Sequence, residues 1–445
     1  MEGTKIKLSE KLGYGLGDFA SNLIWASVGT FLTFFYTDTV GLSAAAIGTM
    51  FLIIRVLDAF IDIGIGVLVD RTKSKHGKAR PWLKWLAIPF GLSGVLLFSA
   101  PDFTGTGALI YAYCTYLIIN IAYSAINVPY GVLNTMITQD SYERSLLNIF
   151  RMTMAVLSSI IITVLTNPLV ETLGGGRQGW MMTFVLYGMM SVILFWITYR
   201  STQERVKPSV VQKSVSIKRG FKALLRNKYW AQLIGFKIIM NTGVAVATGI
   251  NVYYAQYVLG DKNLVGLLGL TTFLPLLVGM LVVAPLIKKL GKRNAALVGI
   301  VVSLFGIVLM MVNPTNLTVV IIAMIIKSIG TVPVLATTYA MLADTVEYGE
   351  WKTGIRTEGL IYSGGSFGAK AGSGLGTALL GWLLAFGGYV GGQTAINETA
   401  MNSIRFMFIY LPLIFYVGMF VVLYFYKLDK QYPQIVKELE QAAGN

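Results

Sequence analysis

The sequence predicts an all-α membrane protein with about twelve transmembrane helices arranged in two six-helix halves. Three observations lead to this fold class. Of the 445 residues, 55% are hydrophobic and 13% are charged, which is about half the charged share of soluble domains. The mean hydropathy is +0.66, and the apolar residues form segments of about 20 residues, the length that crosses a bilayer. Lys and Arg gather in alternate loops between these segments, as they do in polytopic membrane proteins.

The expected spans fall into two sets of six. The first set lies at 14–36, 43–69, 82–101, 107–136, 150–170 and 180–199. The second set lies at 230–258, 264–287, 294–312, 317–343, 359–387 and 403–426. We therefore expect an N-terminal half at 1–200, a central cytoplasmic loop at 201–229, a C-terminal half at 230–427 and a short cytoplasmic tail at 428–445. Two such halves match the parallel-repeat plan of the major facilitator fold.

The basic loops indicate how the chain is oriented in the membrane. One set of loops carries clusters such as those at 71–80 and 288–293, whereas the opposite set carries only Arg177, Lys262 and Arg405. Because cytoplasmic loops hold the excess of Lys and Arg, both termini are expected in the cytoplasm. The same bias explains the net charge of +15, so no nucleic-acid partner is expected. The polar N-terminus predicts no cleavable signal peptide.

Histidine and cysteine are too scarce for most catalytic or metal-binding chemistry. The sequence has one histidine, His76 in a basic loop, and one cysteine, Cys114 in an apolar segment. A transition-metal site, a disulfide framework and a histidine-based catalytic triad are therefore not expected. We predict that the protein is not an enzyme and that it carries no cofactor.

A stripe of charges runs along the second expected span. Arg55, Asp58 and Asp62 are spaced i, i+3 and i+7, so they share one helix face and cannot face lipid. Two carboxylates one turn apart suit a site for Na⁺ or H⁺, and a structural Arg–Asp pair is the alternative. We favour the cation site because the second carboxylate exceeds what one ion pair needs. Lys370, within GGSFGAKAGSGLG in the eleventh span, is the expected partner of these carboxylates.

Polar and aromatic residues share faces of the first and fourth expected spans. Tyr14, Asp18, Asn22 and Trp25 fall on one face of the first span, and Tyr123, Asn127 and Tyr130 fall on one face of the fourth. Aromatic rings stack on the C–H faces of sugars, while amides, carboxylates and guanidinium groups bind their hydroxyls. The pattern predicts a sugar site, and the residues that we assign to it, including two on the eleventh span, are Asp18, Asn22, Trp25, Tyr123, Asn127, Arg151, Ser366 and Lys370.

Two polar connectors on the cytoplasmic side carry both signs of charge. DRTKSKHGKARPW follows the second span, and ADTVEYGEWKTGIRTEG joins the tenth and eleventh. Such groups can pair across the two halves and close a cytoplasmic gate, although topology signalling explains some of the cations. The expected gate residues are Asp70, Arg71, Arg80, Asp344, Glu347, Glu350 and Arg356.

Both connectors, together with YGLGDFASN, RVLDAFIDIGIG and NVPYG, resemble signature segments of the glycoside-pentoside-hexuronide:cation symporters, and the resemblance covers nearly the whole chain in order. It implies a symporter in the bacterial cytoplasmic membrane, expected to be a monomer, that binds a sugar and a coupling ion. By resemblance the cation site holds Asp58, Asp62, Ser124 and Asn127, with Arg55 and Lys370 as coupling charges.

Four positions depart from the members of this family that transport melibiose. Asn22 and Asn127 stand where those members have aspartate, and Gly131 and Leu335 stand where they have tryptophan. The resemblance therefore implies the pentoside, xyloside or glucuronide branch. It leaves Na⁺ and H⁺ open, with Ser124 favouring Na⁺ as an oxygen ligand. Two alternatives remain, a symporter of lipid or drug-like solutes and a membrane sensor that does not transport.

Overall fold

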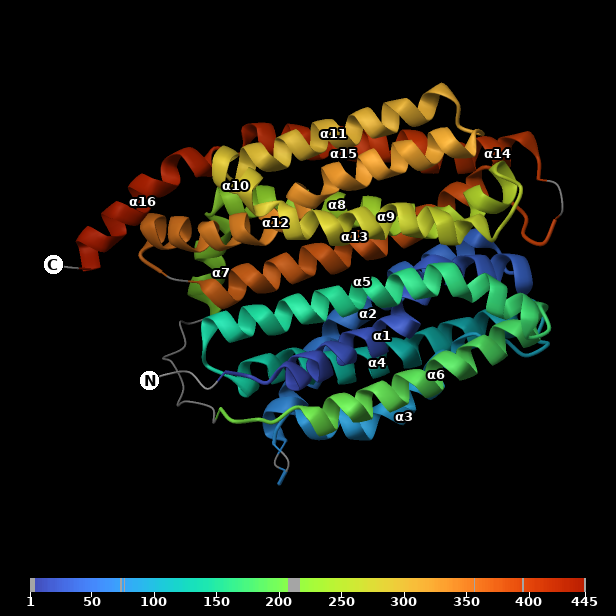
Figure 1. The fold of residues 1–445 in the computed structure, drawn as a ribbon, viewed down its shortest axis with the longest axis horizontal. Helices are drawn as coiled ribbons and strands as arrows, with labels where there is room; N and C mark the ends of the chain where they lie inside the picture. The colour runs from blue at the N-terminus through green and yellow to red at the C-terminus, as the bar shows by residue number, and fades with distance from the viewer. Residues whose placement is uncertain are drawn as a thin grey trace. The chain divides into compact units, whose positions relative to one another are not determined.

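The computed structural model describes residues 5–72, 74–75, 77–206, 217–355, 357–393 and 396–443, and these residues fold almost entirely into helices (Figure 1). No strand occurs among them. Nine helices of this described part are long and apolar enough to cross a membrane by length and composition. Each of the twelve expected spans coincides with a helix, so the predicted all-α membrane fold is confirmed.

The N-terminal spans form six long helices. They are α1 (Leu8–Phe34, continued by the π-helical turn η1, Phe35–Thr39), α2 (Ala44–Arg71), α3 (Arg80–Leu97), α4 (Thr106–Ile137), α5 (Ser141–Thr172) and α6 (Gly176–Ser201). A short helix, α7 (Ile217–Leu225), follows within the segment that was expected to be a loop.

The C-terminal spans are more often interrupted. They are α8 (Lys228–Tyr253) with η2 (Tyr254–Val258), α9 (Leu264–Val282) with α10 (Ala284–Leu290), α11 (Lys292–Val312), α12 (Leu317–Thr353), α13 (Glu358–Phe386), and α14 (Glu398–Arg405) with η3 (Phe406–Tyr410) and α15 (Leu411–Phe425). The expected tail contains a further helix, α16 (Leu428–Ala443).

The helix α12 runs well past the end that hydropathy predicts. The polar residues after 343 end the apolar span but do not end the helix, because no proline follows them and Gly349 is held within the helix. The helix stops at Gly354, whose φ of 68° is a left-handed C-cap conformation. Hydropathy thus predicts where the membrane span ends, whereas the helix itself ends at the glycine that adopts the left-handed conformation, Gly354.

Two compact units make up the chain. Unit 1 consists of residues 1–209, 251–270 and 380–403, and unit 2 consists of residues 210–250, 271–379 and 404–445. Short segments of the C-terminal spans thus group with the N-terminal helices. The predicted boundaries at 200, 229 and 427 stay a prediction.

In unit 1, α1 packs on α5 and α6, α3 packs on α4 and α6, and α2 packs on α4. The α3–α6 contact is close because Gly91 and Gly188 face each other, and a Cβ on either would lie 2.9 Å from the carbonyl oxygen of the other. Serine hydroxyls also bond α5 and α6 to the backbone of α1. Ser158 donates to the Phe19 carbonyl oxygen, and Ser191 donates to the Ala20 carbonyl oxygen. These contacts hold α1, which carries several candidate site residues, against its neighbours.

In unit 2, α11 packs on α12 and α15, and α12 packs on α16. Buried apolar residues of α8, α11, α12, α13, α15 and α16 form one core cluster. Leu428 and Ile435 belong to it. The last helix therefore docks on unit 2 through an apolar face.

Candidate functional site

The helix α2 separates an apolar face from a charged face. Its exposed side chains include Val56, Phe60 and Ile63, which are spaced three or four residues apart and leave 58%, 69% and 68% of their surface exposed. Asp58, by contrast, is 2% exposed. Large apolar side chains on the outer face suit lipid. The predicted placement of Asp58 away from lipid is consistent with this division.

Two contacts of the Asp58 carboxylate differ in quality. The Ser124 hydroxyl of α4 donates to its Oδ1 atom at 3.0 Å. The Arg55 Nη1 atom lies 3.4 Å from its Oδ2 atom, which is longer than the usual 2.7–2.9 Å of a charge-assisted bond. Asp62 lies one turn further along α2 and is half-buried. The structure thus joins Asp58 to Ser124 firmly and to Arg55 loosely.

Aromatic rings from α1 and α4 stack beside this pair. The rings of Trp25 and Tyr123 are 4.0 Å apart and 18° from parallel. The guanidinium of Arg55 lies 5.3 Å from the centre of the Trp25 ring. A cation over an aromatic face is attracted by the ring quadrupole. The structure therefore brings together residues that the sequence placed on three separate helices.

A second ion pair lies along α1. Arg151 of α5 donates through Nε to the Asp18 Oδ2 atom at 2.7 Å, and Asp18 is 9% exposed. The Arg151 guanidinium also lies 4.9 Å from the centre of the Tyr130 ring. Tyr130 and Tyr14 stack at 4.7 Å, and the hydroxyl of each donates to the carbonyl oxygen of the other. This network fixes the charge of Arg151 between α1, α4 and α5.

The two asparagines that stand in aspartate positions differ in their contacts. Asn22 donates through Nδ2 to the carbonyl oxygen of Asp18 at 2.9 Å. The Nδ2 atom of Asn127 is buried and has no hydrogen-bond partner among the described residues. Asn127 thus offers an unused donor on α4, whereas Asn22 is tied to its own helix.

The structure places Ser366 and Lys370 on α13 of unit 2, where Ser366 is exposed and Lys370 is half-buried. The pairing of Lys370 with the α2 carboxylates stays a prediction. Lys237 of α8 is another buried cation of unit 2, at 1% exposure, and its ammonium lies 4.0 Å from the centre of the Tyr339 ring.

Two of the expected gate residues, Arg80 and Asp344, have contacts within their own units. Arg80 donates through Nη2 to the Tyr199 carbonyl oxygen at 2.7 Å in unit 1. Asp344, at 4% exposure, bonds Lys292 at 2.6 Å in unit 2. The remaining expected gate residues are Arg71, which is exposed, Glu347 and Glu350, which are half-buried, and Arg356 and the side chain of Asp70, which lie outside the described residues.

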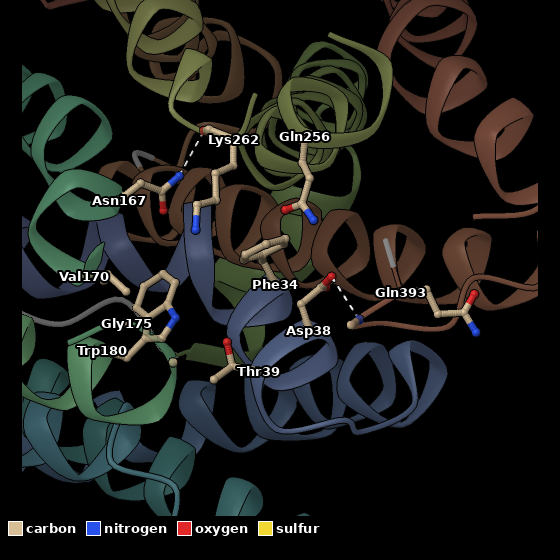
Figure 2. A pocket seen from close by; sticks show the side chains of 12 residues that line it. Phe34, Asp38, Thr39, Asn167, Val170, Gly175, Trp180, Gln256, Lys262 and Gln393 are labelled. Carbon is tan, nitrogen blue, oxygen red and sulfur yellow. Dashed lines mark hydrogen bonds between the residues drawn. The ribbon is translucent and has the colours of Figure 1, made fainter. Parts of the chain in front are cut away.

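A pocket that the sequence did not predict lies within unit 1. Figure 2 shows polar side chains converging on it, among them Asp38, Asn167, Gln256 and Lys262. Its volume is about 270 Å³. The Asn167 amide donates to the Lys262 carbonyl oxygen at 2.9 Å, and the Lys262 ammonium pairs with Glu171 at 3.0 Å. The pocket therefore joins α5 to the loop between η2 and α9.

Asp38 is the centre of a hydrogen-bond cluster at one edge of this pocket. Its carboxylate accepts from the hydroxyls of Tyr389 at 2.7 Å and Tyr257 at 2.8 Å, from the Thr37 hydroxyl at 2.7 Å, and from the Gly392 amide at 3.3 Å. Burial and the nearby carboxylate raise the pKa of the Tyr389 hydroxyl well above its usual range. We call these five residues the Asp38 cluster. It links the end of α1 to η2 and to the segment after α13.

The sequence held a weak signal for this cluster. Asp38 is an acidic residue at the end of the first span, within YTDTVG. Apart from the adjacent Thr37, its partners lie more than 200 residues away, so no spacing pattern could have assembled them.

Comparison with known proteins identifies the family. The model of the MFS/sugar transport protein family matches residues 13–430. The chain is 36% identical over 440 residues to the isoprimeverose transporter of Lactiplantibacillus pentosus, covering 97% of this chain and 91% of that protein. It is 35% identical over 442 residues to a glucuronide carrier protein homolog of Escherichia coli, covering 96% and 94%.

Solved structures share the fold at low sequence identity. A bacterial homolog of the human lysosomal transporter Spinster is similar with a TM-score of 0.67 at 15% identity, covering 97% of this chain and 96% of that chain. The nucleoside transporter NupG is similar with a TM-score of 0.61 at 14% identity, covering 94% and 100%.

The family match bears on three predictions from the sequence. It confirms the major facilitator fold, the resemblance to sugar:cation symporters and the assignment as a transporter and not an enzyme. With its helices of membrane-spanning length, the protein is a multi-pass membrane transporter. The chain belongs to the MFS/sugar transport protein family.

Proposed function

We propose that this protein is a symporter that couples Na⁺ or H⁺ to the transport of a glycoside, pentoside or hexuronide. Relatives named an isoprimeverose transporter, a putative glycoside/cation symporter and a glucuronide carrier homolog support the substrate class. The site that carries the proposal is the buried Asp58 carboxylate, which Ser124 bonds at 3.0 Å and Arg55 approaches only to 3.4 Å. A buried carboxylate beside a hydroxyl offers the oxygen ligands that a hard cation takes.

Coupling follows from the neighbours of Asp58. A cation bound there neutralises the carboxylate and frees Arg55, whose guanidinium already lies over Trp25. Trp25 stacks on Tyr123, and we propose that this aromatic surface binds the sugar ring. Movement of the Arg55 guanidinium would therefore alter the surface that contacts the sugar. Asp18 and Arg151 supply hydrogen bonds to its hydroxyls. The coupling free energy between two such sites is typically about 1–3 kcal/mol and acts equally in both directions.

Alternating access then requires that each end of the transporter close in turn. We propose that the Asp38 cluster closes one end, because it ties the end of α1 to η2 and to the segment after α13. Opening that end would break the two tyrosine bonds to Asp38. The gate at the other end uses Asp70, Arg71, Arg80, Asp344, Glu347, Glu350 and Arg356, with Lys370 and Ser366 joining the central site.

The remaining expectations complete the proposal. The protein works as a monomer in the bacterial cytoplasmic membrane, with both termini in the cytoplasm, as the basic loops indicate. It needs no cofactor besides the coupling ion.

Uptake into sealed vesicles tests the proposal. Labelled xylosides, galactosides and glucuronides would be offered with an imposed Na⁺ gradient in one arm and an imposed proton gradient in the other. We expect accumulation of at least one sugar in one of the two arms. Failure of every sugar in both arms would contradict sugar symport and would favour a lipid or drug-like solute.

A further inference from the structure

Asn120 of α4 is a fully buried amide with one unused atom. Its exposure is 0%, and its Nδ2 atom donates to the Tyr116 carbonyl oxygen of its own helix at 2.6 Å. Its Oδ1 atom is buried and accepts no hydrogen bond from the described residues. Most buried polar atoms are satisfied, so an exception needs an explanation. Because Nδ2 is held by its own helix, Oδ1 is turned away from that backbone.

The register of α4 against α2 places Asn120 beside the charged stripe. Tyr116, Asn120 and Ser124 are four residues apart and therefore lie on one side of α4. The Tyr116 ring packs against Phe51 at 4.9 Å, and the Ser124 hydroxyl bonds Asp58 at 3.0 Å. Asn120 lies between these two contacts along the same interface.

The spacing along α4 supports this placement. Asn120 lies one turn of α4 from Ser124, whose hydroxyl bonds Asp58 at 3.0 Å. Side chains at i and i+4 can bind one ion together, as the two histidines of HExxH zinc sites do.

We propose that Asn120 supplies a third oxygen ligand to a sodium ion bound by Asp58 and Ser124. Hard cations such as Na⁺ take carboxylate, hydroxyl and amide carbonyl oxygens. A neutral amide oxygen cannot serve a coupled proton in the same way, because it does not protonate at physiological pH. The inference rests on the proposed function and deepens it, since it selects Na⁺ from the two ions that the carboxylates leave open.

The test measures Na⁺ binding without transport. The purified full-length protein would be unfolded by heat across a series of NaCl concentrations, with choline chloride holding the ionic strength constant. A ligand that binds only the folded state raises the melting temperature as its concentration exceeds its Kd. We expect Na⁺ to raise the melting temperature of the wild-type protein. The Asn120→Ala variant should need about tenfold more Na⁺ for the same rise, because that is the typical effect of losing one bond to a charged group.

Two further variants sharpen the test. Asn134→Ala is the matched control, because Asn134 is also buried on α4 but bonds Asn148 at 2.9 Å, and its Na⁺ dependence should equal that of the wild type. Asn120→Asp keeps an oxygen and adds a charge, so it should need no more Na⁺ than the wild type. If Asn120→Ala does not fold, the near-isosteric Asn120→Leu carries the same expectation.

Either of two results would overturn the inference, namely no Na⁺ stabilisation of the wild-type protein or the same Na⁺ dependence in Asn120→Ala. Its failure is distinguishable from failure of the proposed function. Sugar accumulation driven by protons alone would remove the sodium site but keep the symporter. Sodium stabilisation that depends on Asn120 in a protein that moves no sugar would keep the site but remove the proposed substrate.

Discussion

Removing Arg151 should destabilise the protein far more than removing an arginine whose acidic partner is exposed. Arg151 bonds Asp18 at 2.7 Å, and the Asp18 side chain is 12% exposed. The Arg151→Gln variant would leave this carboxylate buried without its cation. Breaking a fully buried pair costs about 3–5 kcal/mol. Because 30% of the Arg151 side chain is exposed, solvent screening should bring the cost below that range, to about 2–3 kcal/mol.

Arg177 provides a matched comparison. It pairs with Asp102, whose side chain is 100% exposed, so Arg177→Gln should change the unfolding free energy by less than about 1 kcal/mol. Thermal unfolding of both variants in one detergent measures the difference. The double variant Asp18→Asn/Arg151→Gln should recover part of the loss, because no charge remains buried alone. Equal melting temperatures for Arg151→Gln and Arg177→Gln would refute the argument.

Three further substitutions test other parts of the structure. Trp25→Ala should weaken sugar binding about tenfold, because stacking on an aromatic face contributes about 1 kcal/mol and above. Trp85→Ala is the control and should leave the sugar Kd unchanged, because Trp85 is 58% exposed. Equal Kd values for the two variants would argue against sugar stacking on Trp25. Tyr389→Phe removes one hydrogen-bond donor to Asp38. In a Cys114→Ala background that carries a new cysteine in the pocket, this change should increase the labelling of that cysteine by an impermeant thiol reagent. Unchanged labelling would reject the Asp38 cluster as a gate. Glu204→Gln should lower the unfolding free energy by about 1–2 kcal/mol. The Glu204 carboxylate accepts hydrogen bonds at 2.8 Å from three backbone amides just before and at the start of α3. An unchanged melting temperature would show that these bonds do not stabilise the protein.

The sequence predicted features that follow from a local period. The twelve spans followed from the length of the apolar segments, and the charged stripe of α2 followed from the spacing of Arg55, Asp58 and Asp62. The faces of α1 and α4 were predicted in the same way, and the structure brings Trp25 and Tyr123 into contact. Helical periodicity determines which side chains share a face, so these features needed no tertiary information.

Features that depend on pairing between distant segments could not be predicted. The Asp38 cluster joins residues 38, 257 and 389, and no pattern within one span indicates which of many tyrosines will meet Asp38. Asn120 is a similar case, because an asparagine within a span becomes informative only when the packing shows that its Oδ1 atom has no partner. The roles of Lys370 and of the gate residues stay predictions, since they concern pairing between the two halves.

Asp58 is the residue on which the account depends most directly. Reconstituted wild-type and Asp58→Asn proteins would be compared for sugar accumulation against a gradient and for exchange of labelled for unlabelled sugar at equilibrium. We predict that Asp58→Asn abolishes gradient-driven accumulation and retains measurable exchange, because the amide keeps the shape of the site but gives up the charge that binds the cation. Accumulation by Asp58→Asn at the wild-type level would contradict the proposed cation site.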